Sequence, residues 1–541
     1  MDKKTHPLIL YGLPLLLAAV LKSFLWPTTI TPFNADEAIV GLMARHINQG
    51  QWTPFFYGQS YMGSLDALIV ALGFRLFGEQ VWVIRLVQSL LYLGTVATMV
   101  MLASRLLSST RSALIAGLLA AIPTVNVTLY STVSLGGYGE MLLLGNLLLL
   151  GGIRMIDRLN TEQPIEPRFY WGLAVWGLGA GFAFWVMGLT LVYTIPVLAG
   201  LLWHLYQDEQ AAIIKSLILL GISGLLGSAP WWIPAIMDSS LAVFSELAGG
   251  AIAGVSTGSW LSLTFRRAIN FVVFGGSVVI GARPPWGVRW LMLPLLPLAM
   301  IAWLVILTYS VRKLIKEKGS TRLILVAMIS VVLSAGYIFS PYGDDPSGRY
   351  FLPFLVPMSI FGGDFIAAQF EENKLIGIGL TAFLLIFNLG GIIQSVVDTP
   401  PGLTTQFDAV TQIDHSQIDE LIDFLEDNDI CKGYSNYWVA YPLAFLTQEE
   451  IIFVPRLPYH EDFRYTTRDD RYPPYNDVVS SATEVAYITT RHPVLDDYLR
   501  EQMRNLDITW QEKKIGDYTV YYQLSESIHV RQLGLGKTTT P

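Results

Sequence analysis

Two adjacent carboxylates, Asp36 and Glu37, stand in the stretch "FNADEAIVGLMARHINQG", directly after the first apolar segment of the chain. Asn34 followed three residues later by Glu37 fits the capping box of a helix start. Acids in a first helical turn also interact favourably with the helix dipole, which is a purely structural explanation. A carboxylate at a membrane surface can instead act as a general base toward an acceptor hydroxyl. Both explanations predict a helix beginning near Asn34.

The two acids need not have the same role. Neighbours on a helix point about 100° apart, because one turn takes about 3.6 residues. One acid can therefore face a cavity while the other stays at the helix start, and we expect Asp36 to face the cavity. An apolar stripe follows, which predicts a short helix lying on the outer membrane face and ending at Gly50. The stripe consists of Ile39, Leu42, Met43 and Ile47.

Hydrogen-bonding side chains recur in the next stretch, "YGQSYMGSLDALIVALGFRLFG". Its start is too polar for a clean membrane span. The candidate substrate-binding residues here are Tyr57, Gln59, Tyr61 and Asp66. The alternative is an aromatic belt with one acid facing water.

A third acid, Glu140, begins an apolar segment in "STVSLGGYGEMLLLG" and has no basic residue in its loop. An acid at the start of a span is retained for interior contacts or function, or is favoured there by the helix dipole. Arg349 is the only basic residue of the later stretch "SPYGDDPSGRYFLPF". Its planar guanidinium suits a phosphate, and the alternative is an ion pair with Asp344 or Asp345. Three further arginines that could hold phosphate, or simply lie at the interface, are Arg266, Arg267 and Arg283.

Composition indicates that these residues belong to a membrane protein with many spans. The 541 residues are 52% hydrophobic and only 14% charged, with a mean hydropathy of +0.46. From Asp398 onward the chain carries 24 Asp and Glu against 12 Lys and Arg. Such an acidic tail argues against nucleic acid or an anionic membrane surface as its partner. The single cysteine, Cys431, excludes an internal disulfide.

A helix needs about 20 apolar residues to cross a bilayer, and the chain offers eleven such segments. The first is read as a retained span because no good cleavage site follows it. The segment 170–206 is read as two spans, although no polar turn separates its halves. The predicted spans are 8–27, 80–104, 112–130, 140–156, 170–186, 188–206, 214–235, 290–311, 322–340, 350–369 and 375–397.

The distribution of lysine and arginine predicts the orientation. Alternate loops are rich in basic residues, which places the N-terminus in the cytoplasm. The tail and the stretches 28–79, 131–139, 236–289 and 341–349 are then expected on the outer face. "AINFVVFGGSVVIGA", within the third of these, reads as a partial or re-entrant segment. The basic residues are Lys3, Lys4, Arg105, Arg111, Arg154, Arg158, Arg168, Lys215, Arg312, Lys313, Lys316, Lys318 and Arg322.

Two domains are expected, a transmembrane part over 1–397 and an extracytoplasmic α/β domain over 398–541. In the tail, "DELIDFLEDN" and "VLDDYLREQMRNL" have the apolar spacing of helices. "IIFVP" and "VAYITT" read as buried strands, and "ITWQEKKIGDYTVYYQL" as two strands turning near Gly516. The final "GLGKTTTP" is expected to be disordered. No internal repeat, metal-type Cys/His spacing, Gly-rich phosphate loop or nucleophile elbow is found.

The motifs "NADEA", "YGQSYMGSLDALIVALGFRLFG", "GYGEM" and "SGRYFLPF" together resemble the GT-C glycosyltransferases, in particular the protein O-mannosyltransferase-like and aminoarabinose-transferase-like branch. The resemblance implies transfer of a sugar from a polyprenyl-phosphate donor on the outer face, mostly with inversion. It implies a catalytic role for Asp36, with Glu37 beside it, and for Glu140. It also implies that Arg349 faces the donor phosphate, with Tyr350 next to it, and that Tyr138 lies at the substrate.

The sequence departs from the aminoarabinose branch at one point, because "YMGSLD" lacks the lysine found near the phosphate in that branch. Arg349, another arginine or a metal would supply the charge. Two adjacent acids can hold Mg²⁺ or Mn²⁺, but no third acid is close in sequence, so metal independence is preferred. The expected partners are the lipid-phosphate sugar, membrane lipids and an acceptor that is protein, glycan or lipid. The expected location is the plasma (inner) membrane.

Two other classes of function remain open. A transporter or flippase for a lipid-linked sugar typically shows internal repeats and charges at mid-membrane. A non-catalytic membrane scaffold would bind a partner through its tail, but this role leaves the outer-face acids and arginine unexplained.

Overall fold

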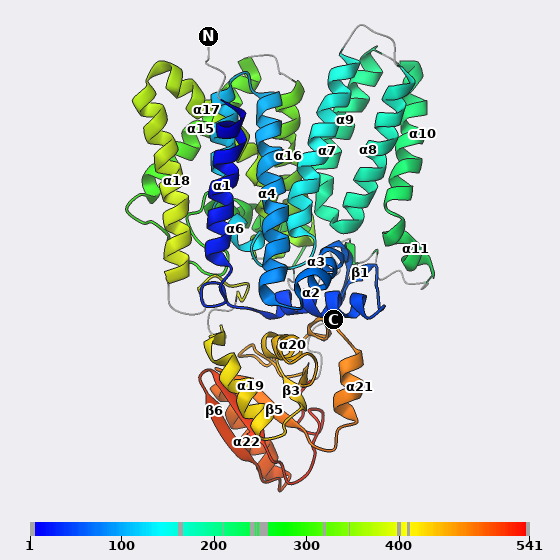
Figure 1. The fold of residues 1–541 in the computed structure, drawn as a ribbon, viewed down its shortest axis with the longest axis vertical. Helices are drawn as coiled ribbons and strands as arrows, with labels where there is room; N and C mark the ends of the chain where they lie inside the picture. Colours follow the sequence, from blue (N-terminus) through cyan, green and yellow to red (C-terminus); the bar gives the residue numbers. More distant parts are fainter. Residues whose placement is uncertain are drawn as a thin grey trace. The chain divides into compact units, whose positions relative to one another are not determined.

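The computed structural model describes residues 6–160, 166–208, 210–237, 244, 246–247, 258–316, 321–345, 347–397, 402–407 and 412–536. The chain forms two compact units. The membrane unit comprises Met1–Leu25, Ser60–Asp66 and Leu86–Ser395, and the tail unit comprises Trp26–Gln59, Ala67–Arg85 and Val396–Pro541. The tail therefore shares its unit with two N-terminal stretches (Figure 1).

Long apolar helices make up the membrane unit (Figure 1). They are α1 (Pro7–Leu25), α4 (Val81–Leu106), α7 (Tyr138–Leu159), α8 (Pro167–Val186), α9 (Leu191–Asp208), α10 (Gln210–Gly227), α15 (Leu296–Lys316), α16 (Thr321–Phe339), α17 (Leu355–Glu372) and α18 (Lys374–Val397). Nine helical segments within the described residues are long and apolar enough to cross a membrane. Residues Ala212–Gly227 and Ala229–Met237 form a tenth if this pair, bent by 67°, is one span. The predicted multi-span architecture is confirmed.

The predicted span 112–130 is instead divided into two short helices, α5 (Thr110–Ala121) and α6 (Val125–Tyr130). Pro123 lies at the break, where it cannot donate a backbone hydrogen bond. The segment 170–206 does form two helices, α8 and α9, joined by a short turn at Gly188–Thr190. At this turn Met187 pairs with Met62 in an isolated bridge, so backbone pairing takes the place of a polar turn.

Shorter helices complete the membrane unit. They are α11 (Ala229–Met237), α13 (Trp260–Asn270) and α14 (Gly276–Val279). α13, the 271–275 turn and α14 follow one another, so "AINFVVFGGSVVIGA" is helical over much of its length. Trp260, Leu261 and Phe265 are exposed, which suits an amphipathic helix in contact with lipid.

The N-terminal stretches of the tail unit contain α2 (Ala35–Asn48), most of α3 (Leu65–Phe77) and the strand β1 (Phe55–Phe56); β2 (Gln59–Gly63) begins there. The tail contributes β3 (Lys432–Ser435), β4 (Ile452–Pro455), β5 (Ala486–Thr490), β6 (Gln511–Ile515) and β7 (Tyr518–Tyr522). They form a five-stranded sheet in the order β4-β3-β5-β7-β6. β3 is parallel to β4 and β5, whereas β7 is antiparallel to both of its neighbours.

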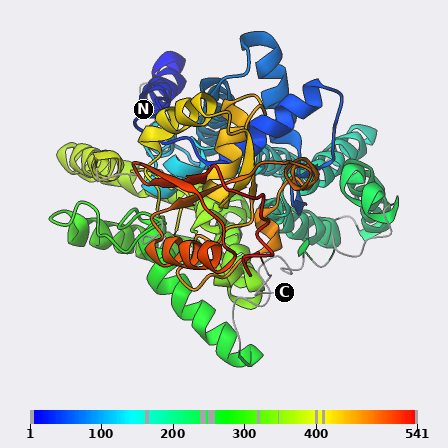
Figure 2. The ribbon, with the colours of Figure 1, turned by 90° about the horizontal axis from the view of Figure 1, so that it is seen from below.

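Helices cover both faces of this sheet. On one face α19 (Ile418–Asp427) and α20 (Tyr437–Leu446) share a core with Phe453, Ile488 and Val520. On the other, Asp496 of α22 (Pro493–Asn505) accepts a hydrogen bond from Tyr521 at 3.0 Å. Figure 2 shows helices of the tail on both sides of its strands. One further short helix, α21 (Pro474–Ser480), precedes β5.

These elements confirm the predicted α/β character of the tail. The predicted strands "IIFVP" and "VAYITT" are β4 and β5, and the predicted hairpin is β6–β7. Gly516 turns the hairpin with a φ of 53°, a left-handed conformation that glycine adopts readily. Most of the final segment that we expected to be disordered, 537–541, lies outside the described residues.

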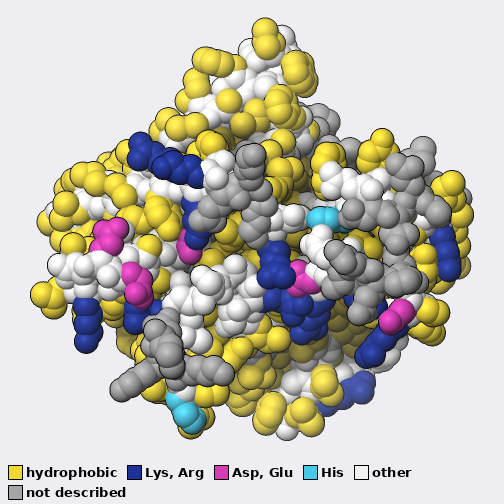
Figure 3. Space-filling view, turned by 90° about the horizontal axis from the view of Figure 1, so that it is seen from above, with side chains coloured by type: hydrophobic (Ala, Val, Ile, Leu, Met, Phe, Trp, Pro, Cys, Tyr) yellow, Lys and Arg dark blue, Asp and Glu magenta, His cyan; other side chains and the backbone are white. Residues whose placement is uncertain are grey.

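One end of the membrane unit, the end at which α1 begins, is rich in basic side chains. Figure 3 looks onto this end and shows more Lys and Arg than Asp and Glu among apolar side chains. Exposed basic residues near helix ends of this unit include Arg154, Arg168, Lys215, Arg312 and Lys316. They belong to the loops that the sequence predicts to be cytoplasmic.

Candidate active site

The opening acids lie at the start of α2, as predicted. The Asn34 side chain accepts hydrogen bonds from the backbone N–H groups of Asp36 at 3.0 Å and Glu37 at 3.2 Å. These bonds satisfy two of the N–H groups that a helix start leaves without a partner. The second half of a capping box does not form, because the Glu37 carboxylate pairs with an arginine instead.

Glu37 forms an ion pair with Arg85 of α4 inside the tail unit. Arg85 Nε donates to Glu37 Oε1 at 3.0 Å and Arg85 Nη2 donates to Oε2 at 2.7 Å. Neither side chain has exposed surface. Burial raises the pKa of Glu37, and the charge and hydrogen bonds of Arg85 act against this rise. Both carboxylate oxygens are therefore engaged, and this arrangement favours a structural role for Glu37.

Asp36 is partly exposed and its carboxylate contacts the tail. Tyr437 Oη donates to Asp36 Oδ1 at 2.6 Å, and Thr405 Oγ1 donates to Oδ2 at 2.9 Å. Asp469 lies in the same neighbourhood, where burial raises its pKa to about 7. Arg471 acts against this shift, whereas the charges of Asp36 and Asp470 add to it. The residues around the candidate base, Asp36, therefore belong to the tail.

Tyr57 and Gln59 are also in the tail unit, against the charged, aromatic loop 464–477. Tyr57 stacks on Tyr472 with ring centroids 4.9 Å apart, and its hydroxyl lies 2.8 Å from Nδ1 of His46. In the amide orientation that satisfies its neighbours, the Gln59 oxygen accepts from Arg471 at 2.8 Å.

The membrane unit holds a second pair of acids, Asp66 and Glu140. Gln88 Nε2 donates to Asp66 Oδ1 at 2.9 Å, and Ser134 Oγ donates to Oδ2. Burial raises the pKa of Asp66 to about 6, and the hydrogen bonds from Ser134 and Gln88 act against this shift. Glu140 is 1% exposed and close enough to interact with the Asp66 charge. The two carboxyl groups lie at hydrogen-bond distance from each other.

Arg349 lies among aromatic rings in the membrane unit. Its Nε donates to Asp345 Oδ2 at 3.0 Å, and Nη2 donates to the same oxygen. The guanidinium carbon lies 5.4 Å from the ring centre of Tyr350 and 6.0 Å from that of Tyr138. Both phenol oxygens are buried without a hydrogen-bond partner among the described residues. A polar ligand beside Arg349 would satisfy these groups.

An apolar cavity of about 290 Å³ opens next to these rings. Its wall includes Tyr61 and Tyr350, so it adjoins the surroundings of Arg349. The remaining wall comes largely from α9, α16 and the turns beside them. The other lining residues are Met187, Gly188, Leu189, Leu191, Val192, Ile195, Leu247, Val332, Leu333, Gly336, Tyr337, Ser340 and Tyr342. This largely apolar lining suits an apolar chain.

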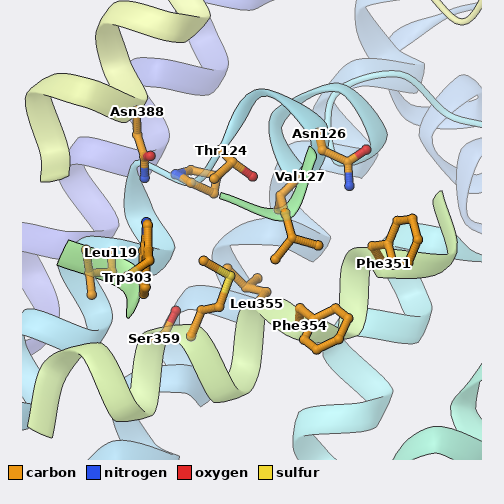
Figure 4. Close-up of a pocket in the computed structure, with 13 residues that line it drawn as sticks. Leu119, Thr124, Asn126, Val127, Trp303, Phe351, Phe354, Leu355, Ser359 and Asn388 are labelled. Carbon is orange, nitrogen blue, oxygen red and sulfur yellow. The ribbon is translucent and has the colours of Figure 1, made fainter. Parts of the chain in front are cut away.

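The break between α5 and α6 helps to position Arg349. Asn126 Nδ2 of α6 donates to the Gly348 carbonyl at 3.1 Å, and Tyr130 Oη donates to the Ser347 carbonyl at 2.8 Å. These bonds fix the backbone directly before Arg349. Figure 4 shows Asn126 together with Phe351 and Phe354 among the residues that line a small cavity of about 30 Å³.

The other candidate arginines are engaged elsewhere. Arg266 and Arg267 donate to Asp344 at 2.8 and 2.7 Å. Burial acts to raise the pKa of Asp344, but hydrogen bonds from the two arginines lower it overall. Arg283 donates to backbone carbonyls, among them Pro284 at 3.1 Å and Gly287 at 3.0 Å.

A divalent ion held by both opening acids does not fit this geometry. The oxygens of Asp36 accept from hydroxyl groups and those of Glu37 from a guanidinium, so the two carboxylates do not converge. No group of three His, Cys, Asp or Glu side chains within the described part of the chain is arranged to hold a metal.

Sequence reasoning missed several polar residues around these sites. Lys22 is 1% exposed within α1, and its Nζ donates to Ser131 at 2.7 Å and Thr132 at 2.9 Å. It thereby fixes the loop that carries Ser134. A lysine inside an apolar span is a recognisable signal. Tyr437 and Thr405 carry no such signal.

The fold and this site are those of a polytopic membrane protein with a sheet-containing C-terminal region. The chain is similar in fold to ArnT from Cupriavidus metallidurans bound to undecaprenyl phosphate, with a TM-score of 0.59, 13% identity, and coverage of 94% of this chain and 98% of that chain. It is also similar to the oligosaccharyltransferase AglB from Archaeoglobus fulgidus in complex with an inhibitory peptide and a dolichol-phosphate, with a TM-score of 0.50, 14% identity, and coverage of 89% and 69%. The predicted resemblance to GT-C enzymes is confirmed at the level of the fold.

A relative by sequence is undecaprenyl phosphate-alpha-4-amino-4-deoxy-L-arabinose arabinosyl transferase 2 from Pseudomonas fluorescens (strain Pf0-1). The match is 23% identical over 407 residues, which is 72% of this chain. The chain spans 66% of the length of that relative. No protein-family model matches the chain.

Proposed function

We propose that the protein is an integral-membrane glycosyltransferase that moves a sugar from a polyprenyl-phosphate donor to an acceptor hydroxyl. One observation carries the proposal. Arg349, paired with Asp345, lies near the rings of Tyr138 and Tyr350. The buried phenol oxygens of these two rings lack partners among the described residues, and Tyr350 also lines an apolar cavity of about 290 Å³. A lipid phosphate matches this combination, because its phosphate accepts hydrogen bonds and its prenyl chain is apolar. Structures similar in fold hold undecaprenyl phosphate or dolichol-phosphate.

The proposed roles follow the chemistry of such a transfer. The acceptor oxygen attacks the anomeric carbon, and the bond from that carbon to the phosphate oxygen breaks. The acceptor proton passes to Asp36, acting as general base, and the electron pair leaves with the lipid phosphate. Arg349 stabilises the charge that grows on this leaving group. Attack from the side opposite the phosphate inverts the anomeric centre.

The acid pair of the membrane unit fits substrate hydroxyls. The buried Glu140 carboxyl group lies at hydrogen-bond distance from that of Asp66, and Asp66 is also held by Ser134 and Gln88. We assign both to sugar binding, with Tyr61 and Tyr138. Glu37 supports α2 through Arg85. A role for Mg²⁺ or Mn²⁺ is not needed in this scheme.

We place the acceptor chemistry on the outer face of the inner membrane. The support is the basic end of the membrane unit (Figure 3), which corresponds to the cytoplasmic side by the positive-inside rule. α1 begins at this end, so the N-terminal side of α1 is cytoplasmic in the proposal.

The test is turnover of a radiolabelled polyprenyl-phosphate sugar by purified protein in detergent. We expect wild type to release sugar to water or to a crude acceptor extract and Asp36→Asn to lose at least about a hundredfold in rate, as general bases contribute that much. Asp462→Asn, which changes an exposed tail acid, is the control and should keep full activity.

Binding of the donor distinguishes the other classes of function. A transporter or flippase would bind the lipid and move it across vesicles without release of sugar, in wild type and Asp36→Asn alike. A scaffold would neither bind the donor nor depend on Asp36. Equal behaviour of the two proteins across several donor sugars would refute the assignment of Asp36.

A further inference from the structure

The Asp36 carboxylate is held on both of its oxygens by residues of the C-terminal tail. Tyr437 and Thr405 donate to Oδ1 and Oδ2 at 2.6 and 2.9 Å, and the backbone N–H of Asp36 is bound to Asn34 at 3.0 Å. A carboxylate that accepts one bond on each oxygen cannot rotate freely about its side-chain bonds. About four lone-pair directions are available to a carboxylate, so positions remain for a substrate hydroxyl.

The helix that carries Tyr437 is itself fixed against α2. Arg45 Nη2, near the end of α2, donates to the Phe445 carbonyl near the end of α20 at 3.0 Å. Gly41 lies between Asp36 and Arg45 in α2, and it packs directly on the ring of Phe445. A Cβ added to Gly41 would lie only 2.4 Å from this ring. The two helices therefore meet at Asp36, at Gly41 and at Arg45, which leaves Tyr437 little freedom relative to Asp36.

Burial strengthens both hydrogen bonds. Tyr437 is 4% exposed and Thr405 is 1% exposed. A hydrogen bond in such surroundings is electrostatically stronger than one in water. The ring of Tyr437 also faces Tyr441, with centroids 5.5 Å apart, and lies 5.6 Å from the Arg471 guanidinium. These contacts hold the hydroxyl donor in one place.

We propose that Tyr437 and Thr405 are positioning residues that aim the Asp36 carboxylate at the acceptor hydroxyl, so that the tail is part of the catalytic apparatus. The inference rests on the proposed function, in which Asp36 is the general base. A base must lie within hydrogen-bond reach of the proton that it removes. A displacement of about 1 Å can cost on the order of a hundredfold in rate.

Substitutions that remove only the hydroxyl groups test this role. We expect Tyr437→Phe and Thr405→Val each to lower kcat about 10- to 100-fold while the affinity for donor stays unchanged. Thr405→Ser keeps the hydroxyl and should restore most of the rate. The matched control is Tyr498→Phe, which removes a tail hydroxyl bound to the Leu533 carbonyl at 2.9 Å and should leave kcat unchanged.

A second measurement does not depend on activity. A water-soluble carbodiimide labels accessible carboxylates, and mass spectrometry reports the labelling of Asp36. We expect Tyr437→Phe and Thr405→Val to raise this labelling, and Tyr498→Phe and Thr405→Ser to leave it at the wild-type level.

The two readouts separate the possible failures. Unchanged labelling and unchanged kcat in Tyr437→Phe and Thr405→Val would overturn the inference. Equal loss of kcat in Thr405→Ser and Thr405→Val would also overturn it, since the hydroxyl would then be irrelevant. Raised labelling together with unchanged kcat would refute the proposed role of Asp36, and so would raised labelling with no turnover even by wild type. In both cases the contacts between Asp36 and the tail would still be supported.

Discussion

Glu37 and Arg85 form an ion pair with no exposed surface, in which each carboxylate oxygen accepts one guanidinium N–H. This relationship explains why two acids stand side by side after the first span. One of them anchors α2 to α4, and its neighbour is left to contact the tail. Arg85 Nη1 also donates to the Trp26 carbonyl at 2.6 Å, which fixes the chain where it leaves α1.

Breaking this pair is expected to destabilise the protein strongly. In Glu37→Gln the Arg85 charge stays buried without its counter-charge, and loss of one partner of a buried pair costs about 3–5 kcal/mol. The measurement is the denaturant or thermal midpoint in detergent. The double variant Glu37→Gln/Arg85→Gln should lose less than the sum of the two single variants. Additive losses would show that the pair contributes no coupling energy.

Arg349→Gln is expected to weaken the binding of a polyprenyl phosphate about 10- to 100-fold. Hydrogen bonds to charged groups contribute about 1.5–3 kcal/mol, and each 1.4 kcal/mol is about tenfold in affinity. Arg266→Gln is the control, because that side chain is more exposed and pairs with Asp344. Equal affinities for Arg349→Gln and wild type would place the phosphate elsewhere.

Gly336 offers a way to fill the apolar cavity without strain. It lines the cavity in α16, and a Cβ added there meets nothing within 4 Å. We expect Gly336→Leu to lower donor affinity about tenfold and to raise helix stability by up to about 1 kcal/mol. Lipid-binding assays and thermal midpoints test the two effects.

The control for this cavity variant is Gly379→Leu. Gly379 lies in α18 with equally open surroundings and does not line the cavity. It should gain the helix stability and keep donor affinity. An equal loss of affinity in both variants would point to an indirect effect of the larger side chain.

Asp469 is expected to give stability a dependence on pH. Its folded-state pKa is raised from 3.8 to about 7, so the unfolded chain releases this proton first as pH rises. Its contribution to the free energy of unfolding is full below about pH 4 and is lost as pH rises to about 7. Asp469→Asn should therefore flatten the slope of thermal midpoint against pH in this window. Asp462→Asn, an exposed acid of the same tail, should leave the slope as it is.

The sequence predicts well whatever depends on local pattern. Apolar length predicts most of the spans, short apolar runs predict β4 and β5, and the turn near Gly516 predicts the β6–β7 hairpin. The span 112–130 fails because its hydropathy continues across Pro123, whereas the backbone cannot. The helix α20 escapes prediction because "YWVAYPLAFL" has a proline inside it and is apolar on all sides, which hides the helical period.

The residues of the candidate site likewise fall into those that the sequence predicts and those that it does not. Asp36, Glu37, Glu140 and Arg349 are visible because charged groups are rare in an apolar chain. Their partners are not visible, since Tyr437 lies 401 positions from Asp36 and a tyrosine in an apolar tail segment resembles core. Arg85 in "VWVIRLVQS" lies within the predicted span 80–104, and only the fold brings it to Glu37.

The contacts between α2 and α20 also bear on how the molecule is made. A ribosome produces Asp36 among the first residues and Tyr437 only after most of the chain has been inserted. Until then α2 lacks α20, the helix that Gly41 and Arg45 contact. A nascent chain that already spans the membrane would therefore still lack the Tyr437 hydroxyl group that holds the Asp36 carboxylate, and the proposed transfer would begin only after synthesis of the tail.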